Sequence, residues 1–163
     1  MNTALWSMQI LWGVFFSITG FGKILWYNPA LWNQALHEVP WLAGVPQGLA
    51  VFIGVSEFLG GVGLILPAMT RVKPKLTPLA AVGLTLVMIL AAVFHIAHGE
   101  YSFLPVNAVL GGVAGFIAYG RSIARPIAPV SMSAFRVITG FAVFAALILV
   151  GFVPALYRLA HLH

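Results

Sequence analysis

Cysteine is missing from the 163-residue sequence, and charged residues make up only 7% of it. The lack of cysteine excludes disulfides, thiolate metal sites and dithiol redox chemistry carried out by this chain alone. The scarcity of charge excludes a water-facing surface, because soluble domains have about 25% charged residues. With 61% hydrophobic residues and a mean hydropathy of +1.03, the chain is predicted to be an all-α integral membrane protein.

Sequence motifs of several enzyme classes are also absent. The sequence contains no glycine-rich phosphate loop after a strand, no G-x-S-x-G nucleophile elbow and no H-E-x-x-H zinc motif. Hydrolysis by a catalytic triad therefore has no support. The net charge of +5 does not indicate nucleic-acid binding, because the basic residues lie in loops, where they orient a membrane protein.

Long apolar windows dominate what is present. A bilayer-spanning helix needs about 20 apolar residues, and the predicted helices cover residues 4–25, 48–66, 76–97, 103–119 and 135–157. The first window lacks a basic leader region and a cleavage site, so we interpret it as a retained helix. We expect one transmembrane domain, 1–163, in which the loop 26–47 carries a short interfacial helix between Pro29 and Pro40.

Lysine and arginine are distributed unevenly between the two ends of these helices. One side has six of them: Arg71, Lys73, Lys75, Arg121, Arg125 and Arg136. The other side has only Lys23 and Arg158. Because basic residues favour the cytoplasmic side, we expect a cytoplasmic N-terminus and an external C-terminus. The loop 26–47 and the turn after the third helix then face outward.

One carboxylate falls within a predicted span, in the stretch FIGVSEFLGGVGLILP (residues 52–67). Glu57 lies near the middle of the second helix, where an unpaired charge costs about 2.5–3.5 kcal/mol. Protonation or a cationic partner would relieve this penalty. Lys23, near the outer end of the first helix, is the candidate partner, although its long side chain could instead extend outward to water.

Two more polar residues fall at the same end of the bundle. His95 lies in the last turn of the third helix, and Asn107 lies one turn inside the fourth. The short connection makes these helices antiparallel neighbours. We therefore predict that Lys23, Glu57, His95 and Asn107 converge from four helices, with the first three as catalytic residues and Asn107 as a ligand contact. The alternative is a polar network that only fixes the packing of the helices.

Trp26, Gly61 and His98 are further candidate ligand contacts. The glycines around Gly61 indicate close helix packing, or else room for a flat ligand. His98 lies on the same helix face as His95. Together with Glu100 these histidines have metal-binding chemistry, but H-x-x-H at a helix end is a weak signal, and we assign no metal site.

Three stretches carry a family resemblance: GFGKI in the first helix, VSEFLGGVGLILP in the second, and GEYSFLPVNAVLGGVAGFIAYGR through the fourth. Together they span about residues 10–121, and they resemble the DoxX and DoxX-like family of small bacterial membrane proteins. The resemblance implies a four-helix bundle in the bacterial inner membrane. It also implies that Lys23, Glu57 and Asn107 occupy recurring polar positions, and it leaves the fifth helix outside the match.

Members of that family look like membrane partners of oxidoreductases, including thiosulfate:quinone oxidoreductase, or accompany quinone detoxification. The favoured hypothesis is a redox-linked protein that binds a quinone-like molecule among its helices. Asn107 or His95 would hydrogen-bond a carbonyl oxygen, and Glu57, tuned by Lys23, would handle protons. The alternatives are an acid–base, isomerase-type enzyme acting on an apolar substrate, or a non-catalytic subunit that docks an oxidoreductase partner. The lipid bilayer is an expected partner, a homo-oligomer stays open, and nucleic acid is not expected.

Overall fold

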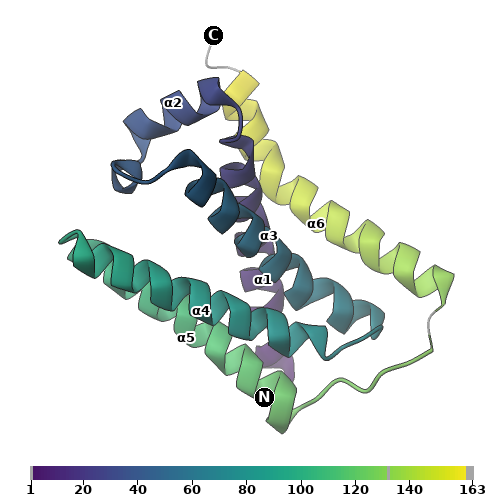
Figure 1. Cartoon of the computed structure of the whole chain (residues 1–163). Coiled ribbons are helices and arrows are strands. Elements are labelled where there is room, and N and C mark those ends of the chain that lie inside the picture. The colour runs from purple at the N-terminus through teal and green to yellow at the C-terminus, as the bar shows by residue number, and fades with distance from the viewer. Residues whose placement is uncertain (1, 132, 161–163) are drawn as a thin grey trace.

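The computed structural model describes residues 2–131 and 133–160, with side chains up to Val150. These residues form helices joined by short connections and no strand. The elements are α1 (Asn2–Leu25), α2 (Pro29–Glu38), η1 (Pro40–Leu42), α3 (Gln47–Thr70), α4 (Leu76–Ala97), η2 (Tyr101–Phe103), α5 (Leu104–Tyr119), the π-helical turn η3 (Gly120–Ala124) and α6 (Ala134–Ala160) (Figure 1).

The two ends of the bundle differ in composition. The tryptophan end, where α1 ends and α3 begins, is defined by Trp26, Trp32 and Trp41. The arginine end, where α3 ends and η3 follows α5, is defined by Arg71, Arg121 and Arg125.

The helices have the length and surface of membrane-spanning segments. α1, α3, α4 and the segment Tyr101–Ala124 are each long and apolar enough to cross a bilayer. Large apolar side chains such as Leu79, which is 64% exposed, cover their outer surface, as expected for contact with lipid. The chain is therefore an integral membrane protein. In α6, the apolar part with described side chains, Ala134–Val150, is shorter, so a fifth span stays a prediction, as does the orientation of the termini.

The predicted helix bounds agree closely with the structure except at the end of α3. α4 has the predicted bounds, and α2 lies where the interfacial helix was expected, with Asn28 capping its N-terminus through a 2.9 Å bond from the Ala30 amide. α3 continues through Pro67 to Thr70, whereas the predicted helix ended at residue 66. In an apolar environment the backbone must satisfy its own hydrogen bonds, so a helix persists through a proline there.

Small residues let α1 and α3 pack in close contact. A Cβ added at Gly20 would lie 2.6 Å from the carbonyl oxygen of Gly54, and one added at Gly61 would lie 2.6 Å from the Ser17 amide nitrogen. These distances leave no room for a side chain. The seam between α1 and α3 therefore depends on residues without one, as small-residue interfaces in membranes do.

The remaining helices surround this pair. α4 and α5 form an antiparallel hairpin on one side, and α6 packs against α1 and α3 on the other (Figure 1). The main core lies between them and contains Phe16, Leu64 and Leu84, which are almost fully buried, while Phe144 of α6 joins its edge. The core separates the polar groups at the tryptophan end from those at the arginine end.

Candidate functional site

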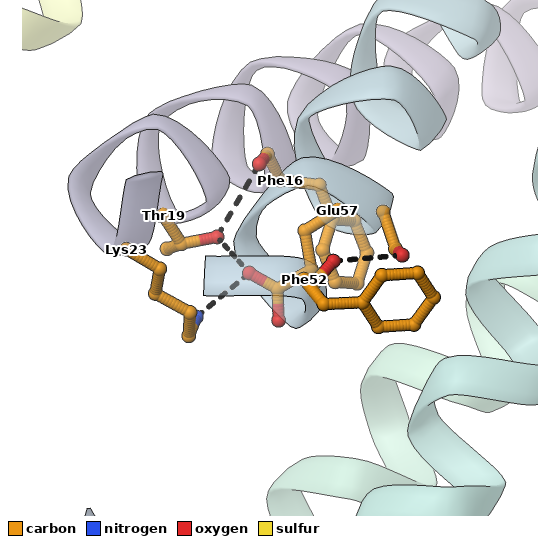
Figure 2. Close-up of polar contacts among 6 residues, drawn as sticks. Phe16, Thr19, Lys23, Phe52 and Glu57 are labelled. Carbon is orange, nitrogen blue, oxygen red and sulfur yellow. Dashed lines mark hydrogen bonds and ion pairs between the residues drawn. The ribbon is translucent and has the colours of Figure 1, made fainter. Parts of the chain in front are cut away.

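An ion pair joins α1 and α3 inside the tryptophan half of the bundle. The Lys23 Nζ lies 2.7 Å from the Glu57 Oε2, and the Thr19 hydroxyl donates to the same oxygen at 3.2 Å (Figure 2). The side chains of Glu57 and Lys23 are only 7% and 16% exposed. The lysine therefore reaches inward to the carboxylate, which settles the two orientations left open by the sequence.

Local sequence positions this pair. Thr19 and Lys23 are four residues apart on α1, so they share the helix face that meets α3. Gly54 lies opposite them, and a Cβ there would be 2.6 Å from the Cβ of Lys23. The absence of a side chain at Gly54 thus allows the lysine stem to pass along α3 to Glu57. The second carboxylate oxygen of Glu57 points away from both partners (Figure 2).

His95 forms a second polar pair, at the end of α4. Its Nδ1 lies 2.7 Å from the Glu100 Oε2, and its ring stacks on Phe103 with 4.6 Å between the ring centroids. The carboxylate fixes one ring nitrogen and the aromatic ring fixes the plane, so the orientation of the imidazole is set from two sides. The Nε2 is the nitrogen left for a ligand.

Asn107 lies in the second turn of α5 and is 9% exposed. Its Nδ2 is buried and has no hydrogen-bond partner among the residues that the structure describes. Buried amide groups are normally paired, and an unpaired donor costs about 1–3 kcal/mol. A ligand oxygen beside Asn107 would recover that energy.

These four groups line one cavity of about 490 Å³ between the α1–α3 pair and the α4–α5 hairpin. Most of its wall is apolar, with Met88 and Leu110 on the hairpin side. Its aromatic part consists of Phe15, Phe16, Trp41, Phe52, Phe94 and Phe103. The sequence predicted the convergence of Lys23, Glu57, His95 and Asn107, and the structure places all four on this cavity.

Trp26, Gly61 and His98 lie elsewhere. Trp26 packs behind the cavity wall against Trp41, at 6.2 Å between ring centroids, and Gly61 lies in the α1–α3 seam. His98 is exposed and its Nδ1 bonds the Phe94 carbonyl oxygen at 2.9 Å. None of the three is among the residues that line the cavity. Their predicted ligand contacts stay predictions, and this cavity does not bring the three residues together with the other four.

His95 and His98 do not share a carboxylate partner. Among the described residues no three His, Asp or Glu side chains are placed to hold a metal ion. His95 engages Glu100, whereas the ring of His98 turns away and stacks on Phe94 at 4.1 Å. His95 and Glu100 thus form a pair, and His98 is separate from it.

Three features of the site were not predicted from the sequence: the contact of Thr19 with Glu57, the pairing of Glu100 with His95, and Trp41 in the cavity wall. Thr19 was not singled out, although its position four residues before Lys23 was a usable signal. Glu100 was considered only as a metal ligand, and its pairing with His95 follows from the backbone turn at Gly99, which has a φ of +72°. Trp41 reaches the cavity from η1, a contact that no local pattern indicates.

The site combines an apolar enclosure with a small number of polar groups. Lys23 and Glu57 together supply a donor and an acceptor at little net charge, Asn107 supplies a free donor, and His95 can donate or accept. Such a cavity suits a neutral, flat, mostly apolar molecule with oxygen substituents.

Comparison with known proteins gives one result. The model of the DoxX-like family matches residues 7–117. The match covers most of α1, all of α2, α3 and α4, and most of α5, and it includes all four polar residues of the cavity. No curated protein and no solved structure matches the chain. The match leaves η3 and α6 outside, close to the extent that the sequence resemblance indicated.

Proposed function

The chain belongs to the DoxX-like family of membrane proteins, and on this premise we propose that it binds a quinone-like molecule in the cavity at the tryptophan end as part of membrane redox chemistry. The observation that carries the proposal is the unpaired Asn107 Nδ2 in an aromatic cavity that also holds the Lys23–Glu57 pair.

The size and lining of the cavity fit such a ligand. Its volume of about 490 Å³ lies within the range of small-molecule sites, about 300–1,000 Å³. A quinone ring is flat and apolar on both faces, and it packs well against the rings of Phe52, Phe94 and Phe103, which line the cavity from three elements. Quinones are themselves membrane-soluble, so they reach a site between transmembrane helices through the lipid.

The polar groups match the two oxidation states of a quinone. The oxidised ring has two carbonyl oxygens that need donors. The Asn107 Nδ2 can supply one, and the His95 Nε2 supplies the other when the imidazole is doubly protonated, because the Glu100 carboxylate takes the Nδ1 hydrogen. The reduced ring has two hydroxyl groups that need acceptors, and the free oxygen of Glu57 can accept from one of them.

Proton handling falls to Glu57 and its partners. Reduction of a quinone to a quinol takes two electrons and two protons. Because this chain has no cysteine, the electrons would come from an oxidoreductase partner. Glu57 is held by Lys23 and Thr19 at the cavity wall. Its ionised carboxylate can take one of the two protons that a quinol releases on oxidation, and it can return that proton to a ring oxygen in the reverse reaction.

A second function is favoured by one further observation. Two carboxylates, Glu57 and Glu100, each hold a basic side chain at the same cavity. Paired acid and base groups in an apolar pocket also suit isomerisation of an apolar substrate without electron transfer. This alternative requires turnover by the protein alone, whereas the redox function requires a partner.

The first test is quinone binding by the purified protein. We expect a short-chain ubiquinone to quench tryptophan fluorescence, because Trp41 lines the cavity. Asn107→Ala should weaken binding about tenfold, since it removes a buried donor. Asn33→Ala, on the exposed face of α2, is the matched control and should leave the affinity unchanged.

Two results would contradict the proposal. One is the absence of saturable quinone binding by the wild-type protein. The other is equal affinity in Asn107→Ala and Asn33→Ala. Conversion of an apolar substrate by the purified chain, abolished in Glu57→Gln, would instead support the acid–base function.

A further inference from the structure

A second cavity of about 390 Å³ lies at the arginine end, far from the aromatic cavity along α1 and α3. It is lined by Asn2 and Trp6 of α1, by the end of α3, and by η3 with the segment that follows it. Three arginines, Arg71, Arg121 and Arg125, take part in the lining. The family match ends at residue 117, before two of these arginines.

Arg121 is unusual because it is a buried cation without a carboxylate. Only 4% of the residue is exposed. Its Nε donates to the Gln9 Oε1 at 2.7 Å, one Nη1 bond goes to the Asn2 Oδ1 at 3.1 Å, and another goes to the Arg125 carbonyl oxygen at 3.5 Å. Every one of these acceptors is neutral, so the charge has no partner of opposite sign among them.

The guanidinium also has an unused donor. The Arg121 Nη2 is buried and has no hydrogen-bond partner among the residues that the structure describes. The Trp6 ring covers the group, with 4.8 Å between the Arg121 Cζ and the ring centroid. The carbonyl of Leu64 holds Gln9 in turn, at 2.6 Å from its Nε2. The side chain is thus fixed in place with one donor still free.

No acidic side chain of the protein lies at this end. The sequence contains three acidic residues in all, Glu38, Glu57 and Glu100. Glu57 is bound to Lys23 and Glu100 to His95, both at the tryptophan end, and Glu38 ends α2 there. A buried cation needs a counter-charge, because removing an ion from water costs several kcal/mol. Among the described residues at the arginine end, no group supplies that charge.

Arg71 and Arg125 border the same cavity and extend the cluster. Arg71 ends α3 in the left-handed conformation, with a φ of 59°, and its Nε donates to the Ala128 carbonyl oxygen at 3.1 Å. This bond ties the segment after η3 to the end of α3. Arg125 is exposed and forms no hydrogen bond through its side chain among the described residues.

We infer that the cavity at the arginine end binds a phosphate group through Arg121, with Arg71 and Arg125 at its rim. Guanidinium groups bind phosphate oxygens with two parallel bonds, and Arg121 has a buried donor available for such a contact. The phosphate is carried either by the headgroup of an anionic lipid or by a soluble phosphate. This inference is independent of quinone binding at the other end.

The orientation of the protein in the membrane does not explain why Arg121 is buried. Basic residues that favour the cytoplasmic side need only lie near the membrane surface. Arg136 at the start of α6 is of that kind, since it is exposed. Arg121 is instead enclosed and held by three side chains, Gln9, Asn2 and Trp6. Such a fixed donor set indicates recognition of a ligand.

The test measures the thermal stability of the full chain in a neutral detergent with two probes. Phosphatidylglycerol, with phosphatidylcholine as the zwitterionic comparison of zero net charge, tests the lipid source, and sodium phosphate alone tests the soluble source. We expect one of the two probes to raise the Tm of the wild-type protein in a saturable manner. Arg121→Gln should weaken that response about tenfold, because it removes a charge-assisted contact.

Matched variants separate this site from general attraction between charges. Arg136→Gln removes the same charge outside the cavity and should respond as the wild type does. Arg125→Gln is an exposed change that does not depend on the buried contacts of Arg121, so it tests the site even when Arg121→Gln fails to fold.

The outcomes are distinct. A response to phosphatidylglycerol alone assigns a lipid headgroup, and a response to sodium phosphate assigns a soluble phosphate. A Tm that neither probe raises overturns the inference. So does an equal loss of response in Arg136→Gln and in the two cavity variants, because the effect would then be one of total charge.

Discussion

The two cavities of this protein differ in whether a buried charge has a partner of opposite sign. At the tryptophan end, Lys23 lies 2.7 Å from Glu57, so the charges cancel within the protein. At the arginine end, Arg121 is as deeply buried but contacts only neutral oxygens and an aromatic ring. The charges at the tryptophan end are balanced within the protein, and the cation at the arginine end lacks a counter-charge.

This difference indicates the kind of ligand that each cavity accepts. A site whose charges already cancel does not gain from a charged ligand, so it suits a neutral molecule held by shape and by single hydrogen bonds. A site with an uncompensated cation gains most from an anion. Since all three acidic residues of the chain lie in the tryptophan half, the arginine end has no internal alternative.

The largest expected effect comes from breaking the internal pair. Lys23→Met should lower the free energy of unfolding by about 3–5 kcal/mol, because it leaves a buried carboxylate without a partner. The double variant Lys23→Met/Glu57→Gln should be about 1–3 kcal/mol more stable than Lys23→Met, because it also removes the orphaned charge. Unfolding in mixed micelles with increasing fractions of ionic detergent gives these values.

The comparison with the other end supplies the control. Arg121→Met should cost less, about 1–3 kcal/mol, because the partners that lose hydrogen bonds are all neutral: Gln9, Asn2 and the Arg125 carbonyl oxygen. Strictly additive effects of Lys23→Met and Glu57→Gln would show that the two groups do not stabilise one another, and the distinction between the two ends would then disappear.

The next largest effect concerns the seam between α1 and α3, the two helices that carry Lys23 and Glu57. Gly20→Ala should lower the free energy of unfolding by about 1–3 kcal/mol, because the added Cβ would lie 2.6 Å from the Gly54 carbonyl oxygen and force α1 away from α3. Quinone affinity should fall as well, since Lys23 moves with α1. Phosphate binding at the arginine end should not change, because Arg121 lies at the opposite end of the helices.

Gly22→Ala is the matched control two residues away. Nothing lies within 4 Å of a Cβ added there, and alanine favours a helix over glycine by about 0.5–1 kcal/mol. The control should therefore be neutral or slightly stabilising. A stability of Gly20→Ala equal to that of Gly22→Ala would show that the seam has room to adapt.

The tryptophan end was largely predictable because its signals are local. A carboxylate in the middle of an apolar helix needs a partner, and Lys23 was the nearest basic residue at the right depth. The short turn after α4 placed His95 and Asn107 at one level. The positions of Trp26, Gly61 and His98 relative to the cavity could not be predicted in this way, because spacing along a helix does not determine which helix face lines a cavity.

The arginine end was not predicted as a site, and the reason is physical. Arg121 was counted among loop residues, where a basic side chain is normally hydrated. Its burial depends on α1 crossing η3, so that Gln9, 112 positions earlier in the sequence, comes within 2.7 Å. Contacts at such separation follow from helix packing, which composition and periodicity do not specify.

The smallest expected effect tests whether ligand binding depends on a histidine that lines the tryptophan-end cavity and not on its exposed neighbour. His95→Leu should weaken quinone binding about fivefold, because a single hydrogen bond contributes about 1 kcal/mol. His98→Leu should leave the affinity unchanged, since His98 is exposed and bonds only the Phe94 carbonyl oxygen. Fluorescence titration of the two variants measures both constants. Similar losses in the two would place the ligand outside the cavity, at the surface of α4, and the neutral-ligand assignment for this end would no longer follow from its internal pairing.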